Sequence, residues 1–221
     1  MASILVSGDT SGSITISAPS VSGTNTLTLP VATDTLVGKA TTDTLTNKSI
    51  VATQLTGTVA AARLPAGSVL QVVSTTKTDV FTTSSTSYVD VTGWTASITP
   101  SATANKILVT VTGYTSNSAS NSFAYLSLLR GSTEIYLGDA RGSATRASAD
   151  VSQQVAGNPE VWAKPTCIQF LDAPSSTSSV TYKLQLKNTT ATSTTVGGTN
   201  TTTDANRSNI PTTIVLMEIQ G

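Results

Sequence analysis

The stretch that decides the fold is Val180-Thr181-Tyr182-Lys183-Leu184-Gln185-Leu186, in which apolar and polar side chains alternate at every position. Because successive side chains of a strand point to opposite faces of a sheet, this alternation predicts a half-buried β-strand. The same pattern recurs in Ser13–Ser17, Thr26–Leu29 and Leu108–Thr112. Ser and Thr supply about a third of all residues and most of the polar positions in these runs. The sequence therefore predicts an all-β protein.

Ionisable residues are few and evenly balanced. The 221 residues include 12 basic and 12 acidic side chains, so the formal net charge is zero, and no basic patch indicates nucleic acid or an anionic membrane as a partner. Histidine is absent and cysteine occurs once, which excludes Ser-His-Asp and Cys-His catalytic groups and metal sites built from His or several Cys. The composition favours a structural or binding protein that is not an enzyme and uses no cofactor.

Aromatic residues divide the chain. Residues 1–66 contain none, and their short apolar runs would bury little core alone, whereas every Phe, Tyr and Trp follows position 67. We therefore expect an extended β-rich stem or attachment arm over 1–66 and a separate head domain over 67–221. Strands in the head are expected at 69–74, 77–83, 87–98, 106–115, 123–130, 133–138, 150–156, 166–172, 178–188 and 211–219. Ten short strands suit a jelly-roll-like β-sandwich.

Two segments of the arm repeat each other. Thr33–Lys39 and Thr42–Lys48 share the pattern Thr-Asp-Thr-Leu, and Gly38 and Asn47 occupy equivalent positions. Both residue types readily adopt positive φ, so each copy predicts an extended piece followed by a tight turn. The alternative is a chance match in a Thr-rich sequence. Repeats this short cannot cover their apolar side within one chain, so as structural repeats they predict association with further copies of the chain.

Several stretches carry a resemblance to a known class of proteins. In the arm these are Gly12–Pro19, Thr26–Pro30, Asp43–Ile50 and Gly57–Pro65, and the run Asp-Thr-Leu-Thr-Asn-Lys is the most specific part. They resemble tail-fibre-like virion proteins of bacteriophages. In the second part, the runs 87–94 and 170–175 are similar to the globular heads that follow such stems. The resemblance implies a homotrimer with an intertwined stem and a jelly-roll head, assembled with other virion proteins.

The function that the resemblance implies is host attachment by a short trimeric tail fibre. Phage tail fibres are commonly longer, and no large virion-anchoring domain is recognisable before the repeats, so two alternatives stay open. The first is a capsid decoration, cement or head-fibre protein whose N-terminal arm binds the shell. The second is a polysaccharide-degrading tail protein that uses a pair of carboxylates. The acids available for such a pair are Glu134, Asp139, Asp150, Glu160 and Asp172.

Three side chains are candidates for recognition of a host glycan or protein. Trp162 lies between Pro159 and Pro165, so we expect a rigid loop in which it stacks on a sugar or anchors a partner, or instead covers one end of the core. Arg141 and Arg146 lie in a segment that could meet anionic glycans, or be plain solvated loop arginines. For Trp94 we expect a place in the core instead.

Metal binding is not expected. Loops that carry Asp139, Asp150, Asn158, Asp204 and Asn206 offer oxygen atoms, but their spacing matches no known calcium loop. Solvated loop groups are therefore the preferred interpretation of these residues.

The remaining expectations concern exposure, loops and location. Cys167 lies in a strand-like run and is expected to be a buried small apolar residue. An Ala-rich run before Pro65 predicts a turn of helix that the proline ends. Polar connections are expected at 115–122, 139–149, 156–165 and 189–209, the last as a mobile loop or a hairpin turning at Gly197-Gly198. Without a signal-like N-terminus or a membrane-spanning run, we expect synthesis in the host cytoplasm and no membrane insertion. The resemblance to phage fibre proteins implies a location in the virion, at the tail or on the capsid surface.

Overall fold

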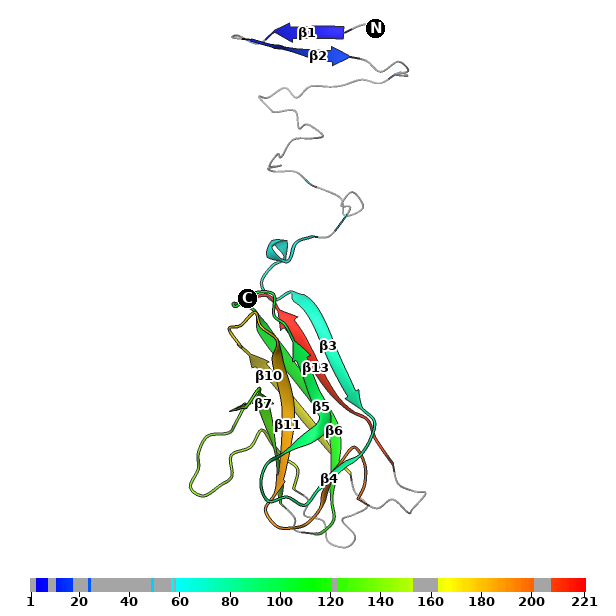
Figure 1. Ribbon diagram of the computed structural model, residues 1–221, viewed down its shortest axis with the longest axis vertical. Coiled ribbons are helices and arrows are strands. Elements are labelled where there is room, and N and C mark those ends of the chain that lie inside the picture. The colour runs from blue at the N-terminus through cyan, green and yellow to red at the C-terminus, as the bar shows by residue number, and fades with distance from the viewer. Residues whose placement is uncertain are drawn as a thin grey trace. The chain divides into compact units, whose positions relative to one another are not determined.

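A computed structural model describes residues 3–7, 11–17, 24, 49, 57, 59–120, 123–152, 163–200 and 208–221 (Figure 1). Their contacts divide the chain into two units, Met1–Thr56 and Gly57–Gly221. The described regular structure is β throughout, apart from one 3-10 turn, η2 (Ala61–Arg63), which lies in the Ala-rich run before Pro65. The expectation of an all-β protein is confirmed.

The first unit contains an antiparallel hairpin. Strand β1 (Ser3–Ser7) pairs with β2 (Ser13–Ser17), and Ser3 lies opposite Ser17. The predicted strand at 13–17 is therefore present. Gly12 precedes β2 with φ of 82°, a conformation that glycine adopts without steric cost. The expected strand at 26–29 and the expected turns at Gly38 and Asn47 lie outside the described residues.

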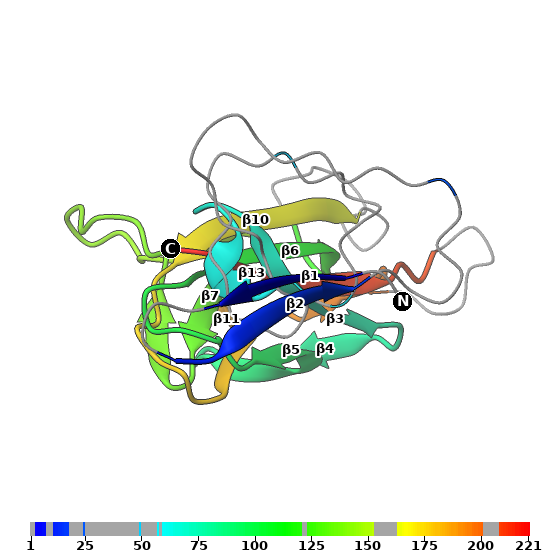
Figure 2. The ribbon, with the colours of Figure 1, turned by 90° about the horizontal axis from the view of Figure 1, so that it is seen from above.

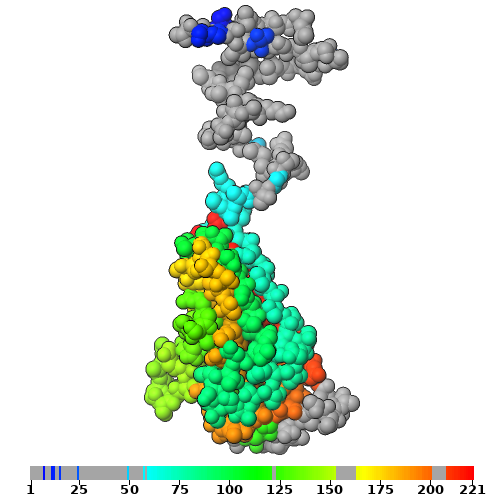
Figure 3. Space-filling view, in the orientation of Figure 1, coloured from blue at the N-terminus to red at the C-terminus, as the bar shows by residue number. Residues whose placement is uncertain are grey.

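The second unit contains two antiparallel sheets. The first sheet consists of β3 (Val69–Lys77), β13 (Thr212–Ile219), β6 (Lys106–Asn117), β10 (Lys164–Asp172), β12 (Thr194–Val196) and β4 (Phe81–Thr83). The second sheet consists of β5 (Val89–Ile98), β11 (Val180–Asn188), β7 (Ala124–Arg130), β8 (Thr133–Ile135) and β9 (Ala149–Asp150). Figure 2 shows strands of the two sheets from above, and Figure 3 shows β5 and β11 side by side in the surface.

Strand β6 organises the first sheet. One of its edges pairs with β10 along almost its whole length, while the other pairs first with β13 and then, from Thr115 to Asn117, with β12. The alternating side chains of β6 place Ile107, Val109 and Val111 in the interior with no exposed surface. Because β6 has both edges paired, it holds the sheet together.

One core lies between the two sheets. Its members come from both of them and include Trp94, Ile107, Val109, Val111, Leu126, Leu128, Tyr182, Leu184, Leu186, Ile214 and Leu216. Trp94 is fully buried, as the sequence predicted, and its indole N–H donates to the carbonyl of Thr213 at 3.3 Å. Gly113 faces this ring, and a Cβ at position 113 would lie 2.8 Å from an indole carbon. Glycine at 113 therefore makes room for the tryptophan.

Threonine is not confined to the solvent side of the sheets. The side chains of Thr115, Thr166 and Thr212 are buried, and their hydroxyls have no hydrogen-bond partner among the described residues. The whole of β12 is buried too. The alternation of Ser and Thr with aliphatic residues thus predicts strands without telling which positions face inward.

Three expectations about strands and loops need correction. The segment 189–209 is neither a plain loop nor a hairpin turning at its glycine pair, because residues 194–196 form β12 and Gly198 pairs with Asn209. The expected strand at 133–138 ends at Ile135, where Tyr136 takes a positive φ. Cys167 is exposed, not buried, because its neighbours Thr166 and Ile168 take the inward positions of β10.

A buried carboxylate near the C-terminal end of β13 connects three segments of the second unit. Glu218 is 1% exposed and accepts hydrogen bonds from Ser101 N and Oγ (2.6 and 2.8 Å), Asn105 Nδ2 (2.6 Å) and Gln71 Nε2 (2.6 Å). Burial acts to raise the pKa of Glu218, but these bonds together outweigh it, and the pKa is lowered from its ordinary value. One side chain therefore joins β13 to β3 and to the β5–β6 connection.

Candidate functional site

The most prominent irregular feature of the second unit is a loop between β8 and β9. Residues 136–148 form it, and it projects from the side of the sheets as the lime-green ribbon of Figure 1 and as the lime-green atoms of Figure 3. It contains both arginines that the sequence marked as binding candidates, and most of its residues are exposed. A projecting loop on a rigid pair of sheets is a common position for recognition residues.

Tyr136 begins this loop in a strained conformation. Its φ of 55° lies in the left-handed region, which a bulky side chain rarely adopts and which costs of order 1–3 kcal/mol. The ring lies 5.0 Å from that of Phe170, with the two planes tilted by 36°. Phe170 belongs to β10 of the first sheet, so Tyr136 bridges the two sheets at their open edge. It is nevertheless 46% exposed, which leaves ring surface available to a ligand.

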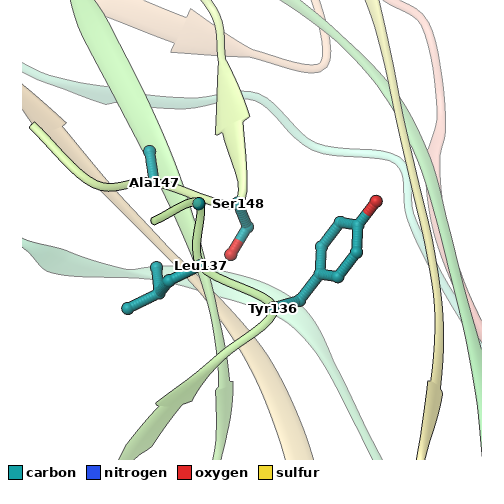
Figure 4. A pocket seen from close by; sticks show the side chains of 5 residues that line it. Tyr136, Leu137, Ala147 and Ser148 are labelled. Carbon is teal, nitrogen blue, oxygen red and sulfur yellow. The ribbon is translucent and has the colours of Figure 1, made fainter. Parts of the chain in front are cut away.

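A depression of about 300 Å³ lies at the base of the loop. Figure 4 shows its lining, in which the side chains of Tyr136 and Leu137 point in opposite directions. The other lining residues are Gly138, Ala147 and Ser148. The Ser148 hydroxyl accepts a hydrogen bond from Leu128 N (2.8 Å) and donates to the Ile135 carbonyl (3.2 Å), so its role is to fix the loop base. The lining suits a small neutral or aromatic-stacking group better than a charged one.

Arg146 closes the base of the loop. Its Nε–H donates to the carbonyl of Gly138 at 2.6 Å, and its own carbonyl accepts the hydroxyl of Tyr88 at 3.4 Å. The Lys187 ammonium lies 4.8 Å from the centre of the Tyr88 ring. Burial, followed by the nearby Glu134 and Tyr125, raises the pKa of Tyr88 to about 12, so its hydroxyl stays protonated as a donor.

Arg141 lies farther out in the same loop. Its side chain is exposed and makes no hydrogen bond or ion pair with the described residues, while its carbonyl accepts a bond from Ala144 N at 3.0 Å. The structure thus brings both predicted arginines into one loop, with Arg146 next to the depression and Arg141 in the turn beyond it. Two exposed guanidinium groups can bind carboxylate, sulfate or phosphate groups of a ligand.

The other predicted site residues cannot be placed in this loop. Trp162 lies outside the described residues, as do the arm positions Gly38 and Asn47. Tyr136, in contrast, was missed by the sequence reasoning, which assigned it to a strand. No local signal in the sequence marks this tyrosine for positive φ or for its contact with Phe170, which belongs to a strand far away along the chain.

Three of the five carboxylates considered for hydrolysis make separate structural contacts. Asp172 is buried and accepts Arg130 Nη1 at 2.9 Å on each oxygen and the Tyr182 hydroxyl at 2.7 Å. Burial and this bond to Asp172 raise the pKa of Tyr182. Glu134 accepts the Ser127 hydroxyl at 2.7 Å, and Asp150 accepts the backbone N–H of Ser152 at 2.7 Å. Asp139 is exposed, and Glu160 lies outside the described residues.

The structure describes only two of the five calcium candidates, Asp139 and Asp150. Asn158, Asp204 and Asn206 lie outside the described residues. Within the described ranges, no three His, Cys, Asp or Glu side chains gather in a way that could hold a metal ion.

Comparisons with known proteins complete the description. None of the helices in the described part of the chain is long and apolar enough to cross a membrane. No protein-family model matches the sequence, and no curated protein was found to match it.

Proposed function

We propose that this chain is a non-enzymatic structural protein of a bacteriophage virion, a short homotrimeric fibre that attaches the phage to its host. In this proposal residues 1–66 are the stem or attachment arm, and residues 67–221 form a jelly-roll head. The resemblance of the arm repeats and of two head segments to tail-fibre-like proteins supports this class. The observation that carries the proposal is the division of the chain into two unlike units.

The two units differ in how much core they can form. The second unit buries a single core with side chains from both of its sheets, including Trp94 and Tyr182. The first 66 residues contain no aromatic residue, so they have little with which to build a core of their own. A chain of this kind combines a self-sufficient head with an arm that gains apolar cover from other copies or from other virion proteins.

In this proposal the head binds the host through the loop 136–148. The exposed ring of Tyr136 offers a stacking surface for a sugar, and the guanidinium groups of Arg141 and Arg146 offer charge-assisted hydrogen bonds to anionic groups of a surface glycan. Three heads on one fibre present this loop three times. Weak contacts with a repetitive cell surface then add through multivalency.

Location and copy number in the virion test the proposal. Antibodies raised against the full chain should label the tail of virions from the source, and quantitative mass spectrometry should find a few trimers per particle. Label spread over the shell, with hundreds of copies per particle, would instead assign the chain to capsid decoration.

Competition for adsorption tests the role of the loop. Purified full-length protein should block adsorption of the phage, and Arg141→Ala should weaken this block several-fold with an unchanged melting temperature, because the exposed Arg141 side chain makes no hydrogen bond or ion pair with the described residues. Arg63→Ala, which changes an exposed arginine in η2, is the matched control. Equal blocking by Arg141→Ala and the unchanged protein would remove this loop from the proposal.

A further inference from the structure

The outer face of the first sheet carries an unbroken apolar row. The strand registers place Val72 opposite Met217, Met217 opposite Leu108, and Leu108 opposite Leu171, across four neighbouring strands. Val72 is 57% exposed and Leu171 is 47% exposed. Large apolar side chains scattered singly over a surface are ordinary, but a row of four across one sheet face is not.

The rows on either side of it are also nearly without charge. The row nearer the start of β3 holds Val69, Ile219 and Lys106, and the two rows on the far side hold Ser74, Val215, Thr110 and Gln169, then Thr76, Thr213, Thr112 and Cys167. The structure describes all four strands in full, and Lys106 is the one charged residue among these fifteen outward positions. This face, defined by the four rows and called the uncharged face below, differs from an ordinary solvated surface.

The second sheet provides an internal comparison. On its outer side Lys183 pairs with Asp90 at 2.8 Å, and Gln185 donates to the same carboxylate at 2.7 Å. Lys187 lies over the Tyr88 ring, and the Ser127 hydroxyl donates to Glu134. The same chain therefore builds one sheet face with charges suited to water and another almost without them. Composition alone does not explain this difference, because both faces draw on the same Ser- and Thr-rich sequence.

We infer that the uncharged face packs against the equivalent faces of the other copies in the assembled protein, an inference that rests on the proposed homotrimer. The polar members of the face are Ser, Thr and Gln, whose side chains both donate and accept hydrogen bonds, so a face of this kind can satisfy a copy of itself. A face that carries carboxylates could not satisfy a copy of itself, because a carboxylate only accepts hydrogen bonds and repels another carboxylate. With no acid and one lysine on the face, two copies also meet without large charge repulsion.

The size of the face indicates how much it contributes. Four strands spaced ~4.8 Å apart and four rows spaced ~7 Å apart span roughly 500 Å² per copy. In a trimer that packs these faces around its threefold axis, each face is shared between two neighbours, so each pair of copies buries about 500 Å² in total. This area is below the range of a specific interface that stands alone. The uncharged face therefore supports a weak association of heads, and the arm must provide the remainder of a stable assembly.

Light scattering coupled to size-exclusion chromatography of the full chain tests the inference. The unchanged protein should be a trimer that dissociates on dilution, and Val72→Lys with Leu171→Lys should weaken its association at least about tenfold, because buried charges are costly. Ser97→Lys is the matched control, since Ser97 is exposed on the outer side of β5, an edge strand of the other sheet. Circular dichroism verifies that all variants are folded.

The outcomes separate this inference from the proposed function. A trimer that the double variant and Ser97→Lys both leave intact would overturn the uncharged face as an interface but keep the homotrimer. A monomeric unchanged protein would overturn both the interface and the homotrimer, while labelling of virions would still test the location.

Cys167 offers a second measurement on the unmodified chain. It is exposed in the single chain, lies on the uncharged face and is the only cysteine. A thiol reagent should therefore label it several-fold more slowly in the trimer than in the dissociated double variant. Equal labelling rates would contradict coverage of this face.

Discussion

Replacement of Glu218 by Gln should destabilise the second unit by roughly 2–4 kcal/mol. The carboxylate is 1% exposed and accepts four hydrogen bonds, three at Oε1 and one at Oε2. A Gln amide can keep its oxygen toward Ser101 and Asn105, but its NH₂ group then faces the NH₂ group of Gln71. One charge-assisted hydrogen bond, worth about 1.5–3 kcal/mol, is lost. The other three hydrogen bonds remain but become weaker, because their acceptor is now a neutral amide oxygen.

Gln71 limits the size of the effect. Its Nε2 also donates to the carbonyl of Thr99 at 2.7 Å, so it keeps one partner in the variant. For a domain of this size, each kcal/mol shifts the melting temperature by roughly 2–4 °C, and we expect a decrease of about 5–15 °C. Urea and thermal unfolding followed by circular dichroism, at one fixed protein concentration, measure it.

The pH dependence gives an independent check. Because the pKa of Glu218 is lowered in the folded state, its contribution to stability is present above its ordinary value of 4.5 and is lost as pH falls through the folded value. The difference in unfolding free energy between the unchanged protein and Glu218→Gln should therefore narrow on acidification below about pH 4.5. Glu134→Gln, at an exposed carboxylate, should change stability by under about 1 kcal/mol. A Glu218→Gln variant as stable as this control at pH 7 would refute the reasoning.

Three further substitutions should change the unfolding free energy measured in urea. Gly113→Ala should destabilise by roughly 1–3 kcal/mol, because its Cβ would lie 2.8 Å from the ring of Trp94, and a value near zero would mean that the ring can move. Asp172→Asn should cost about 2–3 kcal/mol through the lost charge opposite Arg130, whose side chain is one-third exposed, and an unchanged midpoint would show that this pair adds nothing. Thr115→Val should stabilise by about 1 kcal/mol, since it removes a buried hydroxyl without a partner among the described residues, and a loss of stability would reveal an unseen partner.

Much of the strand content could be predicted because it depends on local chemistry. The run 180–186 alternates strictly, and it lies within β11 with Tyr182, Leu184 and Leu186 buried. Trp94, which follows the turn-like pair Thr92-Gly93, was also expected in the core, and it is fully buried. Strand β12 was missed because its Thr-rich residues look like loop, and their burial comes from pairing with β4 and β6, far away in sequence.

The candidate site was predictable only in part. The segment around Arg141 and Arg146 could be recognised as a polar connection with two cations. The place of Tyr136 at the base of this loop could not be recognised, because no local signal marks its positive φ and its contact with Phe170 joins strands far apart in sequence. Cys167 was wrongly expected in the interior. Alternation with a period of two shows that Cys167 and its neighbours face opposite sides of a strand, but which side is buried is known only from the register.

The sequence by itself determined that this protein is built of β-strands, that its charges balance and that histidine chemistry is absent, because these properties belong to the residues themselves. Only the tertiary structure decided which face of each strand is buried. Strand pairing alone brings Val72, Met217, Leu108 and Leu171 into one row, although no two of these four residues are close to each other along the chain. The alternation of side chains between two faces is a property of each strand by itself. The register between strands decides which of the two sets of side chains faces the core.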